Sequence, residues 1–240
     1  MKGKLKRRWP LNEAQICVKK DQKIKLESLS ILLQSQLNVE KFSIVETEKE
    51  SGLDQIIELE QLGLPVKPVI ELERKRIGPK AKQHMGKLVA MFNETNPEEI
   101  SSSLQKNGKY DFDIDGEVIS LDMEDFVVDF DASENFAMAK RENYIVFIST
   151  ARNKELMAKG LIKDIARRLQ TLRKERGYNP TDVLETASIL DLDEESLEMI
   201  KERTKDLSFL VRVKQINFVE SCKEYKDDDI DGQKIRISVE

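Results

Sequence analysis

Residues 153–177 read NKELMAKGLIKDIARRLQTLRKERG, and this stretch decides the architecture because it predicts one long amphipathic helix near 153–176. The apolar side chains share an arc of roughly 100° on a helical wheel, the width of a stripe that faces a core. They are Ala158, Leu161, Ile162, Ile165, Leu169 and Leu172. A glycine commonly follows the last turn of a helix, and Gly177 has this position here. Pro180 prevents the helix from continuing.

On either side of this helix the residue patterns predict an α+β fold, with two small modules of mixed strands and helices. Near the N-terminus, strands at 14–18 and 41–46 flank a leucine-rich helix at 25–37 and could pair in parallel. Asp115-Gly116 separates two alternating runs and predicts a β-hairpin. The other expected elements are strands near 69–72, 126–131, 144–149, 186–192, 209–213 and 215–219, and helices near 79–92, 97–107 and 194–205.

Prolines and blocks of charge divide the chain into parts. Pro65 and Pro68 bracket a break in the apolar patterns. The predicted parts are a basic leading segment plus a small strand-helix-strand module at 1–49, a linker at 50–65, a larger α+β module at 66–220, and an acidic tail at 221–240. The tail could add one edge strand through Ile235, Ile237 and Val239.

The composition is typical of a folded and well-solvated chain. Of 240 residues, 39% are hydrophobic and 35% are charged, and the two signs nearly balance at a net charge of −5. No run approaches the ~18 apolar residues that would suggest a membrane span. The N-terminus also lacks the apolar core of a secretory signal. We therefore expect no membrane association and a cytoplasmic location.

Residues that could carry catalysis are scarce. Cys17, Cys222 and the single histidine, His84, cannot complete a tetrahedral zinc site. Neither GxxxxGK(S/T) nor GxGxxG is present, so no loop is predicted to hold nucleotide phosphates. We expect no catalytic site, metal or cofactor in this chain, and a half-exposed helical position for His84. The carboxylates between 111 and 131 are interpreted as the solvent face of a half-buried sheet rather than a cation site.

Two basic elements indicate a nucleic-acid partner. On the long helix, basic and amide side chains lie opposite the apolar stripe, at a spacing that suits a phosphate backbone. Lys159, Lys163, Arg167, Gln170 and Lys174 share this arc, and the candidate contacts on the helix are Lys163, Arg167, Gln170, Arg173 and Lys174. The second element comprises Lys6, Arg7, Arg8 and Trp9, where an aromatic ring could stack on an unpaired base. The alternatives are an ordinary solvated helix face and a Trp9 that packs into a neighbouring domain.

Three stretches together resemble the C-terminal region of archaeal-type isoleucine–tRNA ligases. Residues 6–11, followed by a strand and a leucine-rich helix, resemble the segment after that family's anticodon-binding helical bundle. Residues 77–80, Ile-Gly-Pro-Lys, are similar to its LGPK element. Residues 159–177 are similar to a late helix of the form EGLxREhxRxhQxhRKExG, where h is apolar. The chain departs from this form at Lys159, Lys163 and Asp164, where the family tends to show Glu, Arg and Glu.

The resemblance implies a region that contacts isoleucine-accepting tRNA on its anticodon side and is not catalytic by itself. The parent enzyme would use ATP and Mg²⁺ in its remaining domains, since HIGH-like and KMSKS-like elements are absent here. The rest of the synthetase chain would be a second partner. Two other functions remain open: a stand-alone RNA-binding factor derived from a synthetase, and a protein-docking module of the synthetase body.

Overall fold

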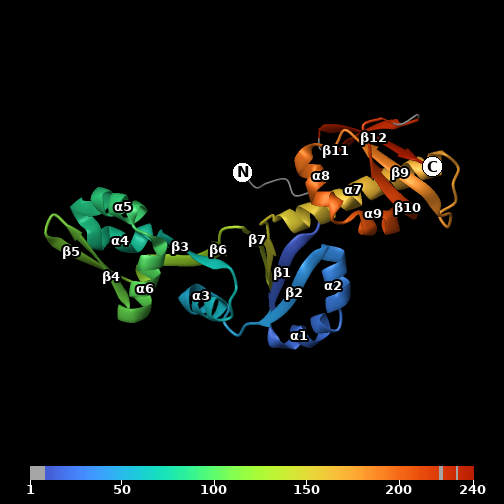
Figure 1. Cartoon of the computed structure of the whole chain (residues 1–240). Helices are drawn as coiled ribbons and strands as arrows, with labels where there is room; N and C mark the ends of the chain where they lie inside the picture. Colours follow the sequence, from blue (N-terminus) through green and yellow to red (C-terminus); the bar gives the residue numbers. More distant parts are fainter. Residues whose placement is uncertain (1–8, 222–223, 231) are drawn as a thin grey trace. The chain divides into compact units, whose positions relative to one another are not determined.

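The computed structural model describes residues 9–221, 224–230 and 232–240, which form two compact units (Figure 1). The C-terminal unit comprises residues 150–240, together with 35–40 and the described residues up to Asn12. The N-terminal unit comprises residues 13–34 and 41–149. Helices and strands occur in both units, so the predicted α+β class is confirmed. The main division follows residue 149 instead of lying within the predicted linker at 50–65.

The C-terminal unit is built around helix α7, Lys154–Glu175. The helix packs on α8 (Glu194–Lys201), α9 (Thr204–Val211) and a four-stranded sheet of order β10-β9-β12-β11. The strands are β9 (Leu184–Leu190), β10 (Val213–Phe218), β11 (Lys226–Ile230) and β12 (Gln233–Val239). Strands β9 and β10 are parallel, whereas β12 is antiparallel to both β9 and β11.

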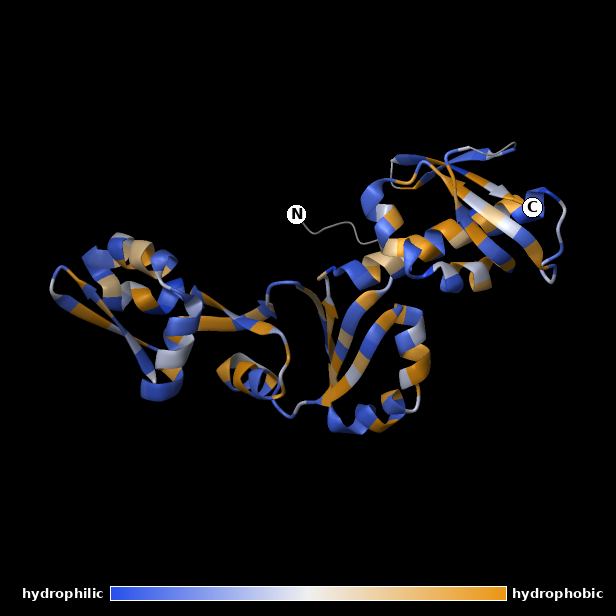
Figure 2. Cartoon of the chain, in the orientation of Figure 1, coloured by the Kyte–Doolittle hydropathy of each residue, from blue (hydrophilic) through white to orange (hydrophobic). Residues whose placement is uncertain are grey.

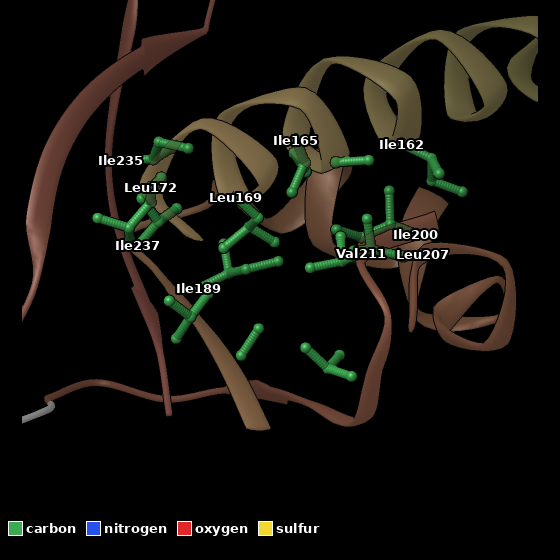
Figure 3. Close-up of a cluster of buried hydrophobic side chains, with 14 of the residues drawn as sticks. Ile162, Ile165, Leu169, Leu172, Ile189, Ile200, Leu207, Val211, Ile235 and Ile237 are labelled. Atoms are coloured by element: carbon green, nitrogen blue, oxygen red, sulfur yellow. The ribbon is translucent and has the colours of Figure 1, made fainter. Parts of the chain in front are cut away.

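Helix α7 has the predicted bounds because local chemistry fixes both of its ends. The side chain of Asn153 accepts a hydrogen bond from the Leu156 N–H at 2.8 Å, which caps the first turn. Gly177 has φ of 81°, the left-handed conformation that commonly ends a helix. The whole predicted apolar stripe is buried. Figure 3 shows four of its side chains directed toward residues of β9, α8, α9 and β12.

Three expectations for the C-terminal unit were wrong. The helix predicted at 194–205 is two helices, and residues 209–211, predicted as strand, belong to α9. That helix is stabilised because Leu207 and Val211, four residues apart, both enter the core. The tail is not peripheral, since β12 lies between β9 and β11 and buries Ile235, Ile237 and Val239. The edge strand is instead the acidic β11.

One half of the N-terminal unit is the sheet β2-β1-β8-β7, in which β1 and β2 each carry both polar and apolar residues (Figure 2). The strands are β1 (Leu11–Val18), β2 (Val39–Glu46), β7 (Phe136–Arg141) and β8 (Tyr144–Ser149). Leu11 N–H donates to Asn38 O, and Thr47 N–H donates to Val18 O, so β1 and β2 run parallel as predicted. Strand β7 was not predicted.

The helix predicted at 25–37 is instead two short helices, α1 (Lys20–Glu27) and α2 (Ser30–Leu37). Neither contains a buried residue, so the leucines that suggested one core-facing stripe do not enter a core. Ile24 and Ile31 are 77% and 84% exposed. The connection between β1 and β2 is therefore a helical pair with a largely solvent-exposed apolar surface.

The other half of the unit pairs β3 (Val66–Leu72) with β6 (Phe126–Ala132), and β4 (Lys109–Ile114) with β5 (Glu117–Asp122). Asp115 and Gly116, with φ of 57° and 84°, form the turn of the predicted hairpin. Around these strands lie α3 (Gly52–Gln61), α4 (Arg74–Ala81), α5 (Met85–Glu94), α6 (Pro97–Asn107) and the 3₁₀ turns η1 (Lys82–His84) and η2 (Met123–Asp125).

Two details of this half differ from the sequence expectations. Helix α3 occupies most of the predicted linker and buries Leu53, Ile56 and Leu59, so this stretch is part of a core. The helix expected to begin at Pro79 begins at Arg74, and η1 separates it from α5. Among the described residues, no helix combines the length and apolar character that crossing a bilayer requires.

Candidate nucleic-acid interface

The outward side of α7 carries a row of exposed cationic and amide side chains, which we name the basic face. It consists of Lys163, Arg167, Gln170 and Lys174, and all four are exposed as the helical wheel predicts. From Lys163 to Lys174 the helix rises about 16 Å at 1.5 Å per residue. Lys159 lies on the same arc but is half-buried and pairs with Glu40 and Glu155, at 2.9 and 3.2 Å.

The charges of the basic face are not neutralised by nearby carboxylates. Among the described residues, Lys163, Arg167 and Lys174 form no ion pair, and the Lys163 ammonium donates only to the Asn38 side chain, at 3.0 Å. Cations on other sides of the same unit do form ion pairs. Examples are Arg168 with Asp228, Arg176 with Glu224, and Lys226 with Glu175. The basic face therefore presents uncompensated positive charge to solvent, which favours anionic partners.

Arg173 cannot serve as the exposed contact that the sequence predicts, because its side chain is only 5% exposed. Its guanidinium group donates to the carbonyl oxygens of Val211, Arg212, Asn179 and Asp182. The last of these hydrogen bonds is 2.7 Å long. Arg173 thus ties the end of α9 and the loop after α7 to the helix, and it has a structural role.

Trp9 packs on α7 instead of presenting its ring to solvent. Its indole N–H donates to the buried carboxylate of Asp164 at 2.8 Å. A Cβ atom at Gly160 would come within 2.5 Å of the Trp9 ring, so only glycine allows this close approach. The Arg152 guanidinium lies 5.7 Å from the ring centroid. This matches the packing alternative, while Lys6, Arg7 and Arg8 lie outside the described residues.

Sequence reasoning missed the C-terminal end of α9. Leu210, Val211 and Arg212 form a groove together with Gln170 and Lys174 of α7, and with residues 178–180. The Gln170 side chain donates to the Leu210 carbonyl oxygen at 2.7 Å, which joins the two helices. The sequence did contain a signal for this end of the helix. Leu207 and Val211 are apolar and four residues apart, a helical spacing that indicates a helix continuing past Phe209.

The other sequence candidates have ordinary surroundings. His84 is half-buried, with Nε2 3.1 Å from a carboxylate oxygen of Glu117. Lys80 of the Ile-Gly-Pro-Lys element pairs with Asp122 at 2.9 Å and with the buried Asp125. The pKa of the Cys17 thiol is raised to about 11, mainly by burial and to a lesser extent by the nearby Glu58 carboxylate. Cys222 lies outside the described residues.

Known proteins that match this sequence include several aminoacyl-tRNA synthetases, and no protein-family model matches it. More particularly, they are isoleucine–tRNA ligases. Those of Methanopyrus kandleri and Pyrococcus abyssi are each 25% identical, over 98% and 88% of this chain. That of Bacteroides fragilis is 28% identical over 75% of it. The predicted resemblance to this family, archaeal members included, is confirmed. The chain spans only 20%, 17% and 15% of the length of these three relatives.

Proposed function

We propose that this chain is the C-terminal, tRNA-contacting region of an isoleucine–tRNA ligase, and that it acts on the anticodon side without catalysing a reaction itself. One observation carries the proposal: three cations on the basic face of α7 have no ion-pair partner among the described residues, although carboxylates compensate several other cations of the same unit. RNA binding through phosphates requires such cations, because each contact displaces a condensed counterion. ATP and Mg²⁺ would act in the remaining domains of the parent enzyme.

A salt titration with a charge-matched control tests the proposal. The test variant carries Lys163→Gln, Arg167→Gln and Lys174→Gln, which keep helix propensity nearly unchanged. The control carries Lys41→Gln, Lys67→Gln and Lys106→Gln, three exposed lysines of the N-terminal unit with no ion pair among the residues described. Both variants lose three positive charges, so any difference in tRNA binding between them depends on where the charges were removed.

We expect the test variant to bind isoleucine-accepting tRNA more weakly, with a log–log salt slope smaller by about 2, since each phosphate contact contributes about 0.7–0.9. Fluorescence anisotropy at several salt concentrations measures both quantities, and thermal unfolding checks that the variants are folded. If the test variant is folded and binds tRNA like the control, the basic face contacts solvent and not tRNA.

A protein-docking module of the synthetase body is the second candidate. It is favoured by the exposed apolar residues of the helical pair α1 and α2, where Ile24, Ile31 and Leu32 are 77%, 84% and 56% exposed. Such a module would show neither tRNA affinity nor a salt slope. A stand-alone RNA-binding factor would bind tRNA equally well, and the coding sequence upstream of Met1 separates it from a synthetase region.

A further inference from the structure

The groove between α7 and α9 has the size and lining of a ligand site. Gln170 and Lys174 line it from α7, Leu210 and Arg212 from the end of α9, and Tyr178 from the loop that follows α7. Its volume is about 490 Å³. Pockets that hold small organic groups occupy roughly 300–1,000 Å³. The groove is therefore large enough for a ligand, and it lies wholly within the C-terminal unit.

Hydrogen bonds fix the walls of the groove. The buried Arg173 guanidinium joins the carbonyl oxygens of Asn179 and Asp182 to those of Val211 and Arg212. Gln170 adds a second connection through the Leu210 carbonyl oxygen. A site whose walls are already positioned loses little conformational freedom when it binds a ligand. The groove is thus preformed.

The charges of the groove select an anion. No carboxylate is among its lining residues. Lys174 and Arg212 are exposed, and neither forms an ion pair with any residue that the structure describes. Lys174 also belongs to the basic face of α7, so the positive charge of that face continues into the groove. A chain of phosphates that follows the basic face would therefore reach the groove without crossing an acidic side chain on α7.

The groove also offers contacts for a flat apolar group. Tyr178 contributes an aromatic ring to its lining, and Leu210 contributes an apolar side chain. A nucleotide combines the required features, because its base is flat and its phosphate is anionic. In a duplex the base is already stacked, so the matching ligand is an unpaired nucleotide.

We propose that this groove binds one unpaired nucleotide of the RNA that the basic face of α7 holds. The base lies against Tyr178 and Leu210, and the phosphate lies at Lys174 and Arg212. This inference rests on the proposed function, because it assumes that the basic face contacts RNA. It adds a site that distinguishes loops from duplexes, which a row of phosphate contacts cannot do.

Two single substitutions examine the groove without touching Lys174. Tyr178→Leu removes the aromatic ring that lines the groove and keeps an apolar side chain against the core. Arg212→Gly removes a cation at a residue with φ of 57°, a conformation that glycine adopts without strain, so folding is preserved. Val183→Ala is the control, since Val183 is 60% exposed and does not line the groove. Lys163→Gln with Arg167→Gln tests the basic face alone.

Binding is measured by anisotropy with two RNAs, a stem with a seven-nucleotide loop and a blunt duplex with the same stem sequence. We expect Tyr178→Leu to weaken binding of the loop RNA about 5-fold or more at an unchanged salt slope, as loss of base stacking does. Arg212→Gly should lower the slope by about 0.7 for the loop RNA. Neither variant should alter duplex binding, and Val183→Ala should alter nothing.

The possible outcomes separate the groove from the basic face. If Lys163→Gln with Arg167→Gln weakens both RNAs while Tyr178→Leu and Arg212→Gly bind like the unsubstituted chain, the groove proposal is overturned and the proposed function stands. If Tyr178→Leu weakens loop and duplex equally, the ring does not select unpaired nucleotides, and the proposal is again overturned. If the unsubstituted chain binds neither these RNAs nor tRNA, both proposals fail.

Discussion

The basic face of α7 and the surface around α4 and α5 both carry exposed basic residues, but only around α4 and α5 do carboxylates pair with several of them. In the N-terminal unit, Arg76 pairs with Glu124 and Lys87 pairs with Asp115, while Lys80 pairs with two aspartates. In the C-terminal unit, Lys163, Arg167 and Lys174 have no ion pair among the described residues. A basic helix is therefore not a binding surface by composition alone.

The difference arises from which acids the fold brings near each helix. The β4–β5 hairpin and η2 place a series of carboxylates beside α4 and α5, so the acidic block at 111–131 partly compensates the cations of its own unit. Exposed pairs of this kind add little to stability, but they remove the positive potential that would attract RNA. Asp164 is the one carboxylate of α7 that lies in sequence between residues of the basic face. It is buried and accepts a hydrogen bond from the Trp9 indole N–H.

The largest effect that we expect comes from Arg173, which has a fixed structural role beside the exposed Lys174. Arg173→Met removes the donor for four carbonyl oxygens in a buried setting, and we expect the free energy of unfolding to fall by about 3 kcal/mol. Urea denaturation measures this loss. Lys174→Met is the matched control and should change it by less than about 0.5 kcal/mol. Equal stability of the two variants would mean that Arg173 does not hold the end of α9.

The second prediction concerns the buried acid of the N-terminal unit. Asp125 is fully buried, accepts a hydrogen bond from the Asp122 N–H at 2.8 Å, and pairs with Lys80. Asp125→Ala leaves that N–H without its acceptor, so we expect a loss of about 2 kcal/mol in urea denaturation. Asp129→Ala is the control, because its pair with Lys140 is exposed and is worth about 0–1 kcal/mol. A smaller loss for Asp125 than for Asp129 would contradict this assignment.

A third experiment removes carboxylates that pair with cations around α4 and α5, so that both regions carry unpaired cations. Asp115→Asn with Glu124→Gln releases Lys87 and Arg76 from their ion pairs. We expect tRNA affinity at low salt to rise about 3-fold, with a steeper salt slope, since two cations become available for phosphates. Glu98→Gln with Glu142→Gln makes the same change of net charge at exposed acids for which no ion pair is found among the described residues. An equal gain in this control would attribute the effect to net charge.

The smallest effect is a change in stability with pH at Cys17. Its pKa in the folded state is raised from 9.0 to about 11, first by burial and then by Glu58. The unfolded thiol therefore ionises before the folded one, so the contribution of Cys17 is complete below pH 9 and is lost as the pH rises toward 11. In a chain with Cys222→Ser, reaction with a thiol reagent at pH 8 should be slow until urea unfolds the N-terminal unit. Rapid reaction under native conditions would contradict this.

Elements specified by local interactions could be predicted from the sequence. The bounds of α7 follow from its apolar spacing, the Asn153 cap and Gly177, and the β4–β5 turn follows from Asp115-Gly116. Helix α6 is fixed in the same way, by the Asn96 cap and Gly108 with φ of 70°. Each of these features depends on residues only a few positions apart. The exposure of Lys163, Arg167 and Lys174 was predictable for the same reason, because it depends on the helical period.

Other features were decided only by the tertiary structure, because they depend on contacts between residues that are distant in sequence. Arg173 and Lys174 are adjacent and both basic, yet α9 and the 178–182 loop bury the first and leave the second exposed. The strand Gln233–Val239 alternates like an edge strand, but it becomes an inner strand because β9 and β11 pair with its two sides. The pairing of the N-terminal cations required the hairpin to fold against α4 and α5. Sequence periodicity fixes which side of an element is apolar, whereas the partner that covers each side is set by packing free energy summed over the whole unit.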